Sequence, residues 1–173
     1  MNLRSRDIRE EFFAAAYAKL MFKKLVAAVD GSSCSAHALE VALRLAEAEG
    51  SRIAICSIVD PVSTSAPAGH AAEMAANAKR HAQQIVDKAL ARAKLAGVTA
   101  EGTTLLGEPA EEIVAYAKEA HADAVVVGTH GRSGFKRFFL GSVAESVLRS
   151  ASIPVVIVRD EARIGFANTS AAS

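Results

Sequence analysis

The sequence predicts an α/β protein built on a doubly wound parallel sheet of five strands, in the order 3-2-1-4-5, with helices on both faces. From about residue 22 onward, short runs rich in β-branched residues alternate with longer segments of helical spacing. Runs that are apolar throughout are typical of strands covered on both faces, as in a parallel sheet. Right-handed crossovers then let such a chain wind in one direction and reverse.

Five segments have the length and composition of strands. Each is bounded by Gly, Pro or Asp, and the first, fourth and fifth contain the continuous apolar runs. In chain order they are residues 25–29 (LVAAV), 52–59 (RIAICSIV), 98–106 (VTAEGTTLL), 123–128 (DAVVVG) and 154–158 (PVVIV).

Four segments between these strands repeat apolar residues at the spacing of a helix that packs one face on a sheet. Their ends carry start and stop signals: "DGSSCS" offers N-cap residues, Pro109 precedes two acids, and Gly50 and Gly97 lie where helices should stop. The apolar positions are Leu39, Leu43 and Ala46; Ala78, Ala82, Ile85 and Ala89; Ala110, Ile113, Val114 and Ala117; and Val143, Ala144, Val147 and Leu148.

The 173 residues suffice for one domain, which we place at residues 22–160. Residues 1–21 are predicted to be an N-terminal helical extension, and residues 161–173 a flexible C-terminal tail. The small, polar segment 61–70, which follows the second strand, is the one long loop and could act as a lid.

Charge and cysteine content exclude several classes of protein. The 20 basic and 19 acidic residues nearly cancel, so we expect neither nucleic acid nor an anionic membrane as a partner. Two isolated cysteines, Cys34 and Cys56, support neither a disulfide framework nor a cysteine zinc site, which fits a cytoplasmic location. No uncharged apolar run of about 18 residues is present, so no membrane span is predicted.

Two glycine-containing segments, far apart in the sequence, are predicted to meet at one crevice. In a 3-2-1-4-5 sheet the strand order reverses between the first and fourth strands, and ligands bind beyond the carboxyl ends of the strands at that point. Asp30, Gly31 and Ser32 follow the first strand, and Gly128 to Gly131 follow the fourth. This convergence predicts a binding site there.

The second segment, "GTHGRSGFKRFFLGS" (128–142), has the composition of an anion-binding loop. Its glycines permit positive φ and close approach of the backbone to a ligand. It leads into a predicted helix N-terminus at Gly141-Ser142-Val143, where free N–H groups favour phosphate and Ser142 can cap the helix or bond a phosphate oxygen. Arg132, Lys136, Arg137 and His130 can add positive charge, and which of His130, Lys136 and Arg137 contacts phosphate stays open.

Two common nucleotide motifs are absent from the sequence: neither the Walker pattern nor a dinucleotide-binding G-x-G-x-x-G after a strand occurs. The pattern Gly128-x-x-Gly131, nine residues, then Gly141-Ser142 instead resembles the signature of the universal stress protein family, in its ATP-binding branch. "MFKKLVAAVDGS", "VVVGTHGR" and "IPVVIVR" are similar to segments of the same family, and the resemblance covers residues 22–159.

The resemblance implies an adenine nucleotide alpha hydrolase-like fold that binds ATP, with or without Mg²⁺, as a homodimer paired through the fifth strand (Val155 to Val158). It places Asp30 and the backbone near Val29 at the adenosine, Ile58 at the adenine and Gly128 at the ribose. A carboxylate meets phosphates only through a cation, so ribose, adenine or Mg²⁺ is the partner we expect for Asp30. The implied nucleotide-binding residues are Ala28, where the family often has proline, Val29, Asp30, Ile58, Val127, Gly128, His130, Gly131, Arg132, Gly141, Ser142 and Val143.

The function that follows is that of an ATP-binding regulatory or stress-response protein. No catalytic constellation is evident, so we expect at most slow ATP hydrolysis or autophosphorylation. Two alternatives stay open: a dimeric interaction protein of the same fold that does not use nucleotide, and a weak ATPase or adenylyl-transferring enzyme.

Several of these residues also have plain structural interpretations. Asp30 could merely cap the turn that follows it, and His130 could be a solvated, exposed turn residue. Cys34 is most simply a small residue at a helix start. The other histidines, His37, His70, His81 and His121, lack metal-ligand spacing and are interpreted as solvated or packing residues.

Overall fold

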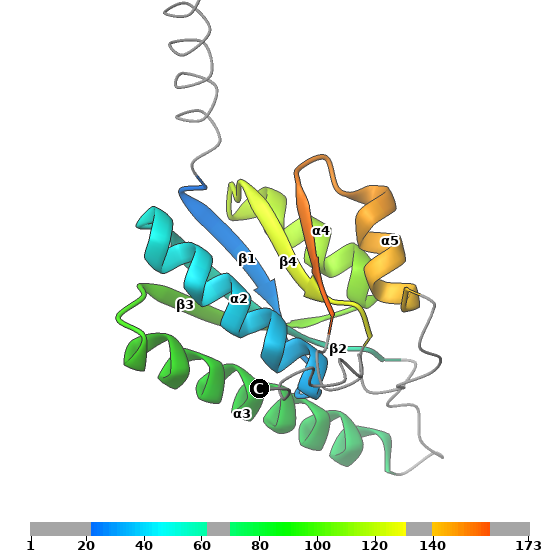
Figure 1. Ribbon diagram of the computed structural model, residues 1–173. Coiled ribbons are helices and arrows are strands. Elements are labelled where there is room, and N and C mark those ends of the chain that lie inside the picture. The colour runs from blue at the N-terminus through cyan, green and yellow to red at the C-terminus, as the bar shows by residue number, and fades with distance from the viewer. Residues whose placement is uncertain (1–21, 62–69, 131–139, 160–173) are drawn as a thin grey trace, which may run out of the picture.

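Five parallel strands lie in the order β3-β2-β1-β4-β5, which confirms the predicted topology (Figure 1). The structure, a computed structural model, describes residues 22–61, 70–130 and 140–159. The elements are β1 (Lys24–Ala28), α2 (Ser33–Glu49), β2 (Arg52–Val59), α3 (Ala71–Leu95), β3 (Ala100–Leu106), α4 (Pro109–Glu119), β4 (Ala124–Gly128), α5 (Ser142–Ser150) and β5 (Val155–Val158).

The apolar runs of the central strands are buried because helices cover both faces of the sheet. In β1, Leu25 and Ala27 belong to the hydrophobic cluster that lies against α2 and α3. Val26 points to the opposite face and joins the cluster beneath α4 and α5. Side chains alternate between the faces of a strand, so a strand covered on both faces must be apolar at every position.

Most of the predicted helix ends are confirmed. The hydroxyl of Ser32 caps α2 by accepting a hydrogen bond from the N–H of Ser35 at 3.1 Å. Gly50 ends this helix in the left-handed conformation, with a φ of 67°. Pro109 is the first residue of α4, as the sequence predicts, and Glu108 is the cap that accepts from the N–H of Glu111 at 2.8 Å.

Several boundary predictions differ from the structure. β1, β4 and β5 each begin one residue away from the predicted start, and two further differences are larger or concern the site. The N-cap of α5 is Gly141 and Ser142 is the first helical residue, so Ser142 does not cap the helix, which was one of the two roles that the sequence left open for it. The third strand begins at Ala100, not at residue 98, because the N–H of Val98 bonds the carbonyl of Ala93 and closes the end of α3.

Some predictions fall outside the described residues. These are the N-terminal extension (1–21), the C-terminal tail (161–173), most of the proposed lid (62–69) and the middle of the glycine loop (131–139). In the part of the chain that the structure describes, no helix combines the length and the apolar character needed to cross a membrane.

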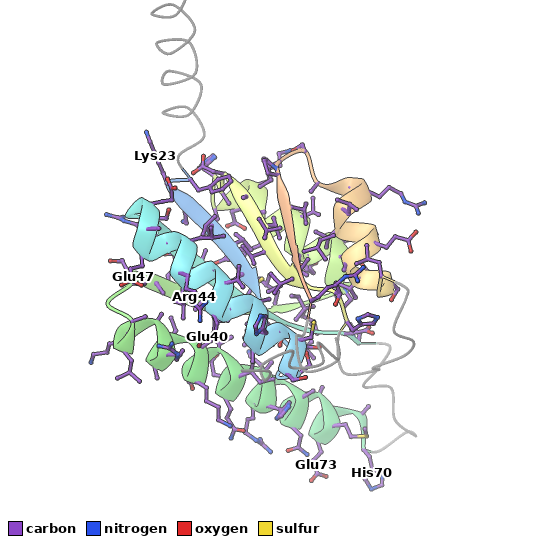
Figure 2. The ribbon with its side chains drawn as sticks, in the orientation of Figure 1. Lys23, Glu40, Arg44, Glu47, His70 and Glu73 are labelled. Carbon is purple, nitrogen blue, oxygen red and sulfur yellow. The ribbon has the colours of Figure 1, made fainter. Side chains whose placement is uncertain are left out.

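An ion pair ties the two helices on one face together. The guanidinium of Arg92 on α3 donates from Nε and Nη2 to the two carboxylate oxygens of Glu40 on α2, each at 2.6 Å. Figure 2 shows Glu40, Arg44 and Glu47 along the edge of α2 that borders α3. The polar outer face and the apolar inner face thus follow the helical spacing in the sequence.

The carboxylate of Asp123 joins the amino ends of β1 and β4. Its Oδ2 accepts hydrogen bonds from the N–H groups of Lys23 and Lys24 at 2.7 and 2.9 Å. The N–H of Asp123 in turn donates to the carbonyl of Lys24 at 2.8 Å. These bonds hold together the two neighbouring strands between which the strand order reverses.

We therefore expect Asp123→Ala to lower the free energy of unfolding by about 1 kcal/mol, because two backbone donors lose a charged acceptor that is partly screened by solvent. Urea unfolding measures the change. Glu47→Ala, an exposed carboxylate on α2, is the control and should stay within about 0.5 kcal/mol of the parent. Equal effects of the two substitutions would contradict a specific role for Asp123.

Candidate functional site

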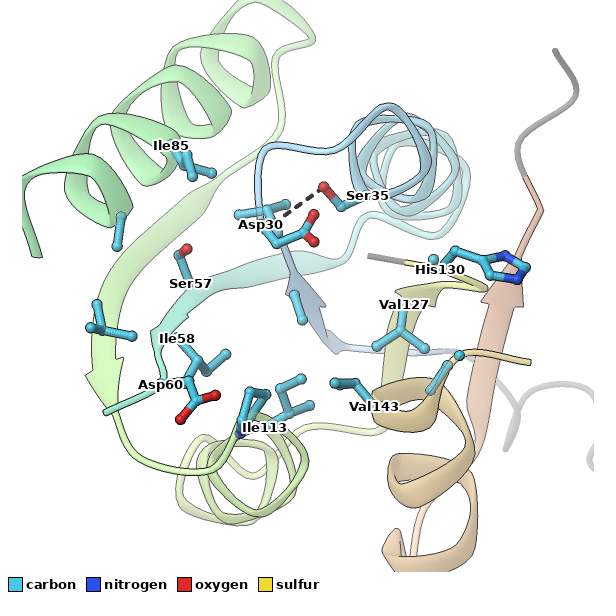
Figure 3. A pocket seen from close by; sticks show the side chains of 18 of the residues that line it. Asp30, Ser35, Ser57, Ile58, Asp60, Ile85, Ile113, Val127, His130 and Val143 are labelled. Atoms are coloured by element: carbon cyan, nitrogen blue, oxygen red, sulfur yellow. Dashed lines mark hydrogen bonds between the residues drawn. The ribbon is translucent and has the colours of Figure 1, made fainter. Parts of the chain in front are cut away.

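A pocket of about 610 Å³ opens at the carboxyl ends of β2, β1 and β4 (Figure 3). This is where a doubly wound sheet binds ligands, beside the reversal of strand order between β1 and β4. Helix α3 forms the wall at the β2 side, the first turns of α4 and α5 form the opposite wall, and α2 contributes Ser35.

Ten of the twelve residues predicted for the site line this pocket. The two others, Gly131 and Arg132, lie outside the described residues. The ten are Ala28, Val29, Asp30, Ile58, Val127, Gly128, His130, Gly141, Ser142 and Val143.

Asp30 lines the pocket and also holds the turn that leads into α2. Its Oδ1 accepts from the N–H and the hydroxyl of Ser32, at 3.0 and 2.6 Å. Its own N–H donates to the hydroxyl of Ser35 at 3.2 Å, the dashed line in Figure 3. The interpretation of Asp30 as a turn cap is therefore confirmed, and the same interactions fix its carboxyl group at the edge of the pocket.

The two described glycines of the signature are needed for close packing, not for positive φ. Gly141 has a φ of −64°, and Gly128 is not among the described glycines with positive φ. A Cβ on Gly128 would lie 2.8 Å from Sγ of Cys34, and one on Gly141 would lie 2.9 Å from the carbonyl oxygen of Thr129. The expectation that these two glycines adopt positive φ is therefore wrong. Glycine is needed at both positions because neighbouring backbone atoms and α2 lie too close for a side chain.

The N-terminus of α5 faces the pocket through Gly141, Ser142 and Val143. The first intrahelical bond runs from the N–H of Glu145 to the carbonyl of Gly141, and no side chain caps this end among the described residues. The N–H groups of the first turn therefore have no acceptor inside the helix, and the helix dipole adds positive potential there. This end of the pocket favours an anion.

Thr129 connects this helix to the end of the sheet. Its N–H donates to the carbonyl of Val158, and its carbonyl accepts from the N–H of Gly141, both at 2.8 Å. Its hydroxyl lies 3.1 Å from Nδ1 of His130 and 3.5 Å from Sγ of Cys34. Cys34 is thus a buried packing residue that belongs to this contact.

The ring of His130 points away from the pocket, toward β5 (Figure 3). The residue is half-buried, so the expectation of an exposed turn histidine is wrong. Among the described residues its Nε2 is buried and has no hydrogen-bond partner. Its contact with Thr129 holds the ring on the far side of the loop.

The sequence analysis missed the wall that α3 supplies. Ala78, His81, Ala82 and Ile85 line the pocket at positions i, i+3, i+4 and i+7 of one helical face. Helical spacing predicted that Ala78, Ala82 and Ile85 face the sheet. They also line the pocket because α3 extends beyond the ends of the strands. The other lining residues that were not predicted are Ser35, Ser57, Val59, Asp60, Pro109, Ile113, Thr129 and Ala144.

The described lining carries two carboxyl groups, Asp30 and Asp60, and neither lysine nor arginine. The predicted basic residues Arg132, Lys136 and Arg137 belong to the segment 131–139, which lies outside the described residues. Cys56, on β2 beneath the pocket, is fully buried, and desolvation raises the pKa of its thiol to about 12, so it stays neutral. Over the described ranges, no group of three or more His, Cys, Asp and Glu residues could hold a metal ion.

Comparison with known proteins gives a consistent match. The model of the universal stress protein family matches residues 21–159. The universal stress protein YxiE of Bacillus subtilis is 36% identical over 148 residues, which cover 80% of this chain and 100% of the relative.

Solved structures agree in fold. The universal stress protein UspA of Lactobacillus plantarum superposes with a TM-score of 0.70 at 21% identity, over 79% of this chain and 97% of that one. A universal stress protein crystallised in complex with cAMP superposes with a TM-score of 0.61 at 30% identity, over 81% of this chain and 98% of the other.

The packing at Gly128 predicts that Gly128→Ala lowers the free energy of unfolding by about 1 to 3 kcal/mol, because its Cβ would press on Cys34. Urea unfolding tests this. In a Cys34→Ala background the cost should be smaller but not zero, since the carbonyl carbon and oxygen of Cys34 would still lie 3.0 Å from the new Cβ. An additive double mutant would show that the two residues do not press on each other.

Proposed function

The chain belongs to the universal stress protein family, and from this premise we propose that it binds adenine nucleotides, with ATP as its ligand. Bound nucleotide would favour one conformation or partner state of a regulatory protein of the stress response. ATP would act as a ligand and not as a substrate.

The proposal rests on the pocket beside the reversal of strand order, which the uncapped N-terminus of α5 faces. Such an end suits phosphate groups, because several N–H groups converge on it without acceptors in the helix. The remaining walls are largely apolar and suit a flat heteroaromatic base, with Ile58, Ile85 and Ile113 as their larger side chains.

The similar protein that was crystallised with cAMP supports an adenine nucleotide as the ligand class. ATP carries more charge than cAMP, and the described lining offers Asp30 and Asp60 but neither lysine nor arginine. We propose that backbone N–H groups of α5, basic residues of the glycine loop such as Arg132, and Mg²⁺ near Asp30 meet that charge.

Equilibrium titration of nucleotide-free protein with ATP tests the proposal, and Ser142→Asp locates the phosphates. The new carboxylate would stand at the first residue of α5, where it favours the helix but repels phosphate. Like charges about 4 Å apart near a protein surface repel by roughly 1 to 4 kcal/mol, so we expect ATP affinity to fall about tenfold or more without loss of stability.

Ser146→Asp is the matched control, since Ser146 is exposed on the same helix and does not line the pocket. It should bind ATP as the parent does. If the parent fails to bind at millimolar ATP, the proposed function is wrong and the interaction-protein alternative is favoured. Equal affinity of both variants would place the phosphates elsewhere.

We also propose a homodimer formed through β5, which is an edge strand of the described sheet. Its residues Val155 to Ile157 are only half-buried, and an apolar edge strand is a template for pairing with another chain. The carbonyls of Pro154 and Val158 bond to β4, so by alternation the N–H of Ile157 points to the free edge.

Light scattering should give a mass of two chains for the parent. Ile157→Pro removes an edge N–H without breaking a bond to β4, and we expect it to shift the mass toward one chain. Ile157→Ala keeps the N–H and controls for the lost side chain. A parent of single-chain mass would remove the dimer from the proposal.

A further inference from the structure

One side of β3 is not covered by a helix in the described part of the chain. On the covered side, a Cβ added to Gly102 would press on Val86 of α3. Side chains alternate along a strand, so Glu101, Thr103 and Leu105 point to the other side, where Leu105 packs against the cluster beneath α4 and α5. Helix α4 packs mainly on β2 and α5. Glu101 is therefore exposed, and Thr103 and Leu105 are only half-buried.

The flank of α4 that borders this side of β3 carries an aromatic ring between two acids. Glu112, Tyr116 and Glu119 lie at i, i+4 and i+7 of the helix and share one side. Glu112 lies against the end of β3, because a Cβ on Gly107 would be 2.5 Å from its Oε1. Desolvation above all, and then nearby charges that include Glu101, raise the pKa of the half-buried Tyr116 to about 12. The β3 face is the surface formed by Glu101, Thr103, Leu105, Glu112, Tyr116 and Glu119.

The β3 face is apolar at its centre and acidic at its carboxyl end. The basic neighbours among the described residues are Lys24 and Arg52, at the amino ends of β1 and β2. Nζ of Lys24 lies 2.7 Å from Oε1 of Glu101, so the amino end of the face carries a formed ion pair. At the carboxyl end, Glu108 and Glu112 belong to the start of α4. A partner that covers this face should therefore present apolar side chains with positive charge at one end.

The N-terminal extension (residues 1–21) lies outside the described residues and joins the domain at the edge where the β3 face begins. The carbonyl of Phe22 accepts from the hydroxyl of Ser51, and that of Lys23 accepts from the N–H of Arg52 at 2.9 Å. These bonds fix the point of entry at the amino ends of β1 and β2. The family match begins at residue 21, so the extension up to that point precedes the shared domain.

The sequence of the extension has the pattern of a helix with one apolar side. At about 3.6 residues per turn, its larger apolar residues and one alanine fall on a single arc. They are Ile8, Phe12, Phe13, Ala16, Tyr17 and Leu20. Arg6 and Arg9 fall on the same arc, whereas the acids Asp7, Glu10 and Glu11 fall outside it. The apolar side thus carries its positive charge near the beginning of the chain.

The length of the extension suits the β3 face. Two strand spacings, about 10 Å, separate β1 from β3, and about three extended residues cross that distance. The remaining residues, roughly 18, would form a helix of about 27 Å. The seven residues of β3 extend over about 23 Å. A helix that starts from the amino end would bring Arg6 and Arg9 to the carboxyl end of the face, beside Glu112.

We propose that the N-terminal extension covers the β3 face of its own chain, with its apolar side on Leu105 and Tyr116 and its arginines beside Glu112. The covalent link holds the extension at a high effective concentration, which favours the same chain over a separate partner. None of the residues of the β3 face lines the nucleotide pocket, so the proposal does not rest on nucleotide binding.

A single tryptophan in the full chain tests the contact, because the natural sequence contains none. Phe12→Trp places the reporter on the apolar side of the extension, and Glu10→Trp places it outside that side. We expect Phe12→Trp to emit at shorter wavelength and to be quenched less by acrylamide than Glu10→Trp, since the β3 face shields the indole from water. Equal emission and equal quenching of the two variants would overturn the proposal.

Two substitutions in the Phe12→Trp chain locate the contact. Glu112→Lys sets a cation against the arginines of the extension, and Thr103→Lys sets one at the centre of the face, so each should shift the emission to longer wavelength. Glu111→Lys is the matched control. It removes an exposed acid from the same first turn of α4, with the same loss toward the helix dipole, but outside the β3 face. It should leave the emission unchanged.

The other possible occupants give different results. Far-UV circular dichroism first confirms that each variant is folded. Emission that responds to neither Glu112→Lys nor Thr103→Lys would place the extension elsewhere and overturn the proposal. A short-wavelength emission that develops only with rising protein concentration would identify a second copy, and one that develops only with phosphatidylglycerol vesicles would identify a membrane. Either result would also overturn it, and neither bears on the proposed nucleotide site.

Discussion

The two backbone hydrogen bonds of Thr129 hold the site together. One joins the end of β4 to the end of β5 through Val158, and the other joins it to the start of α5 through Gly141. They place a helix N-terminus beside the carboxyl ends of β1 and β4, which is the geometry that favours an anion. The bond to Gly141 is the one that holds the start of α5 at the edge of the pocket.

This constraint gives the glycine motif a structural meaning beside its functional one. Gly128 and Gly141 are in tight contact with Cys34 and with the carbonyl of Thr129 even in the free protein. A side chain at either position would push α2 or α5 out of place before it met any ligand. Gly128 and Gly141 therefore encode the scaffold around Thr129, beside any part that the motif plays in binding a ligand.

The pocket has two chemically different ends on either side of β1. At one end, α5 offers backbone donors without acceptors in the helix. At the other end, α3 and β2 offer largely apolar side chains together with Ser57. A ligand that satisfies both must join an anionic group to a flat polar ring, and the proposed adenine nucleotide has this composition. Asp30, held by Ser32 and Ser35, lies between the two ends.

The sequence by itself determined the strands, the helices and their order, because burial on both faces makes strands apolar and right-handed crossovers restrict how they connect. It also placed Asp30 and the glycine motif at one crevice, since the carboxyl ends of parallel strands share an edge. Only the tertiary structure decided that Ser57 and His81 belong to the pocket and that the ring of His130 turns away from it. Those outcomes depend on how far α3 extends past the strands and on contacts such as that of Thr129 with His130, which local periodicity does not encode.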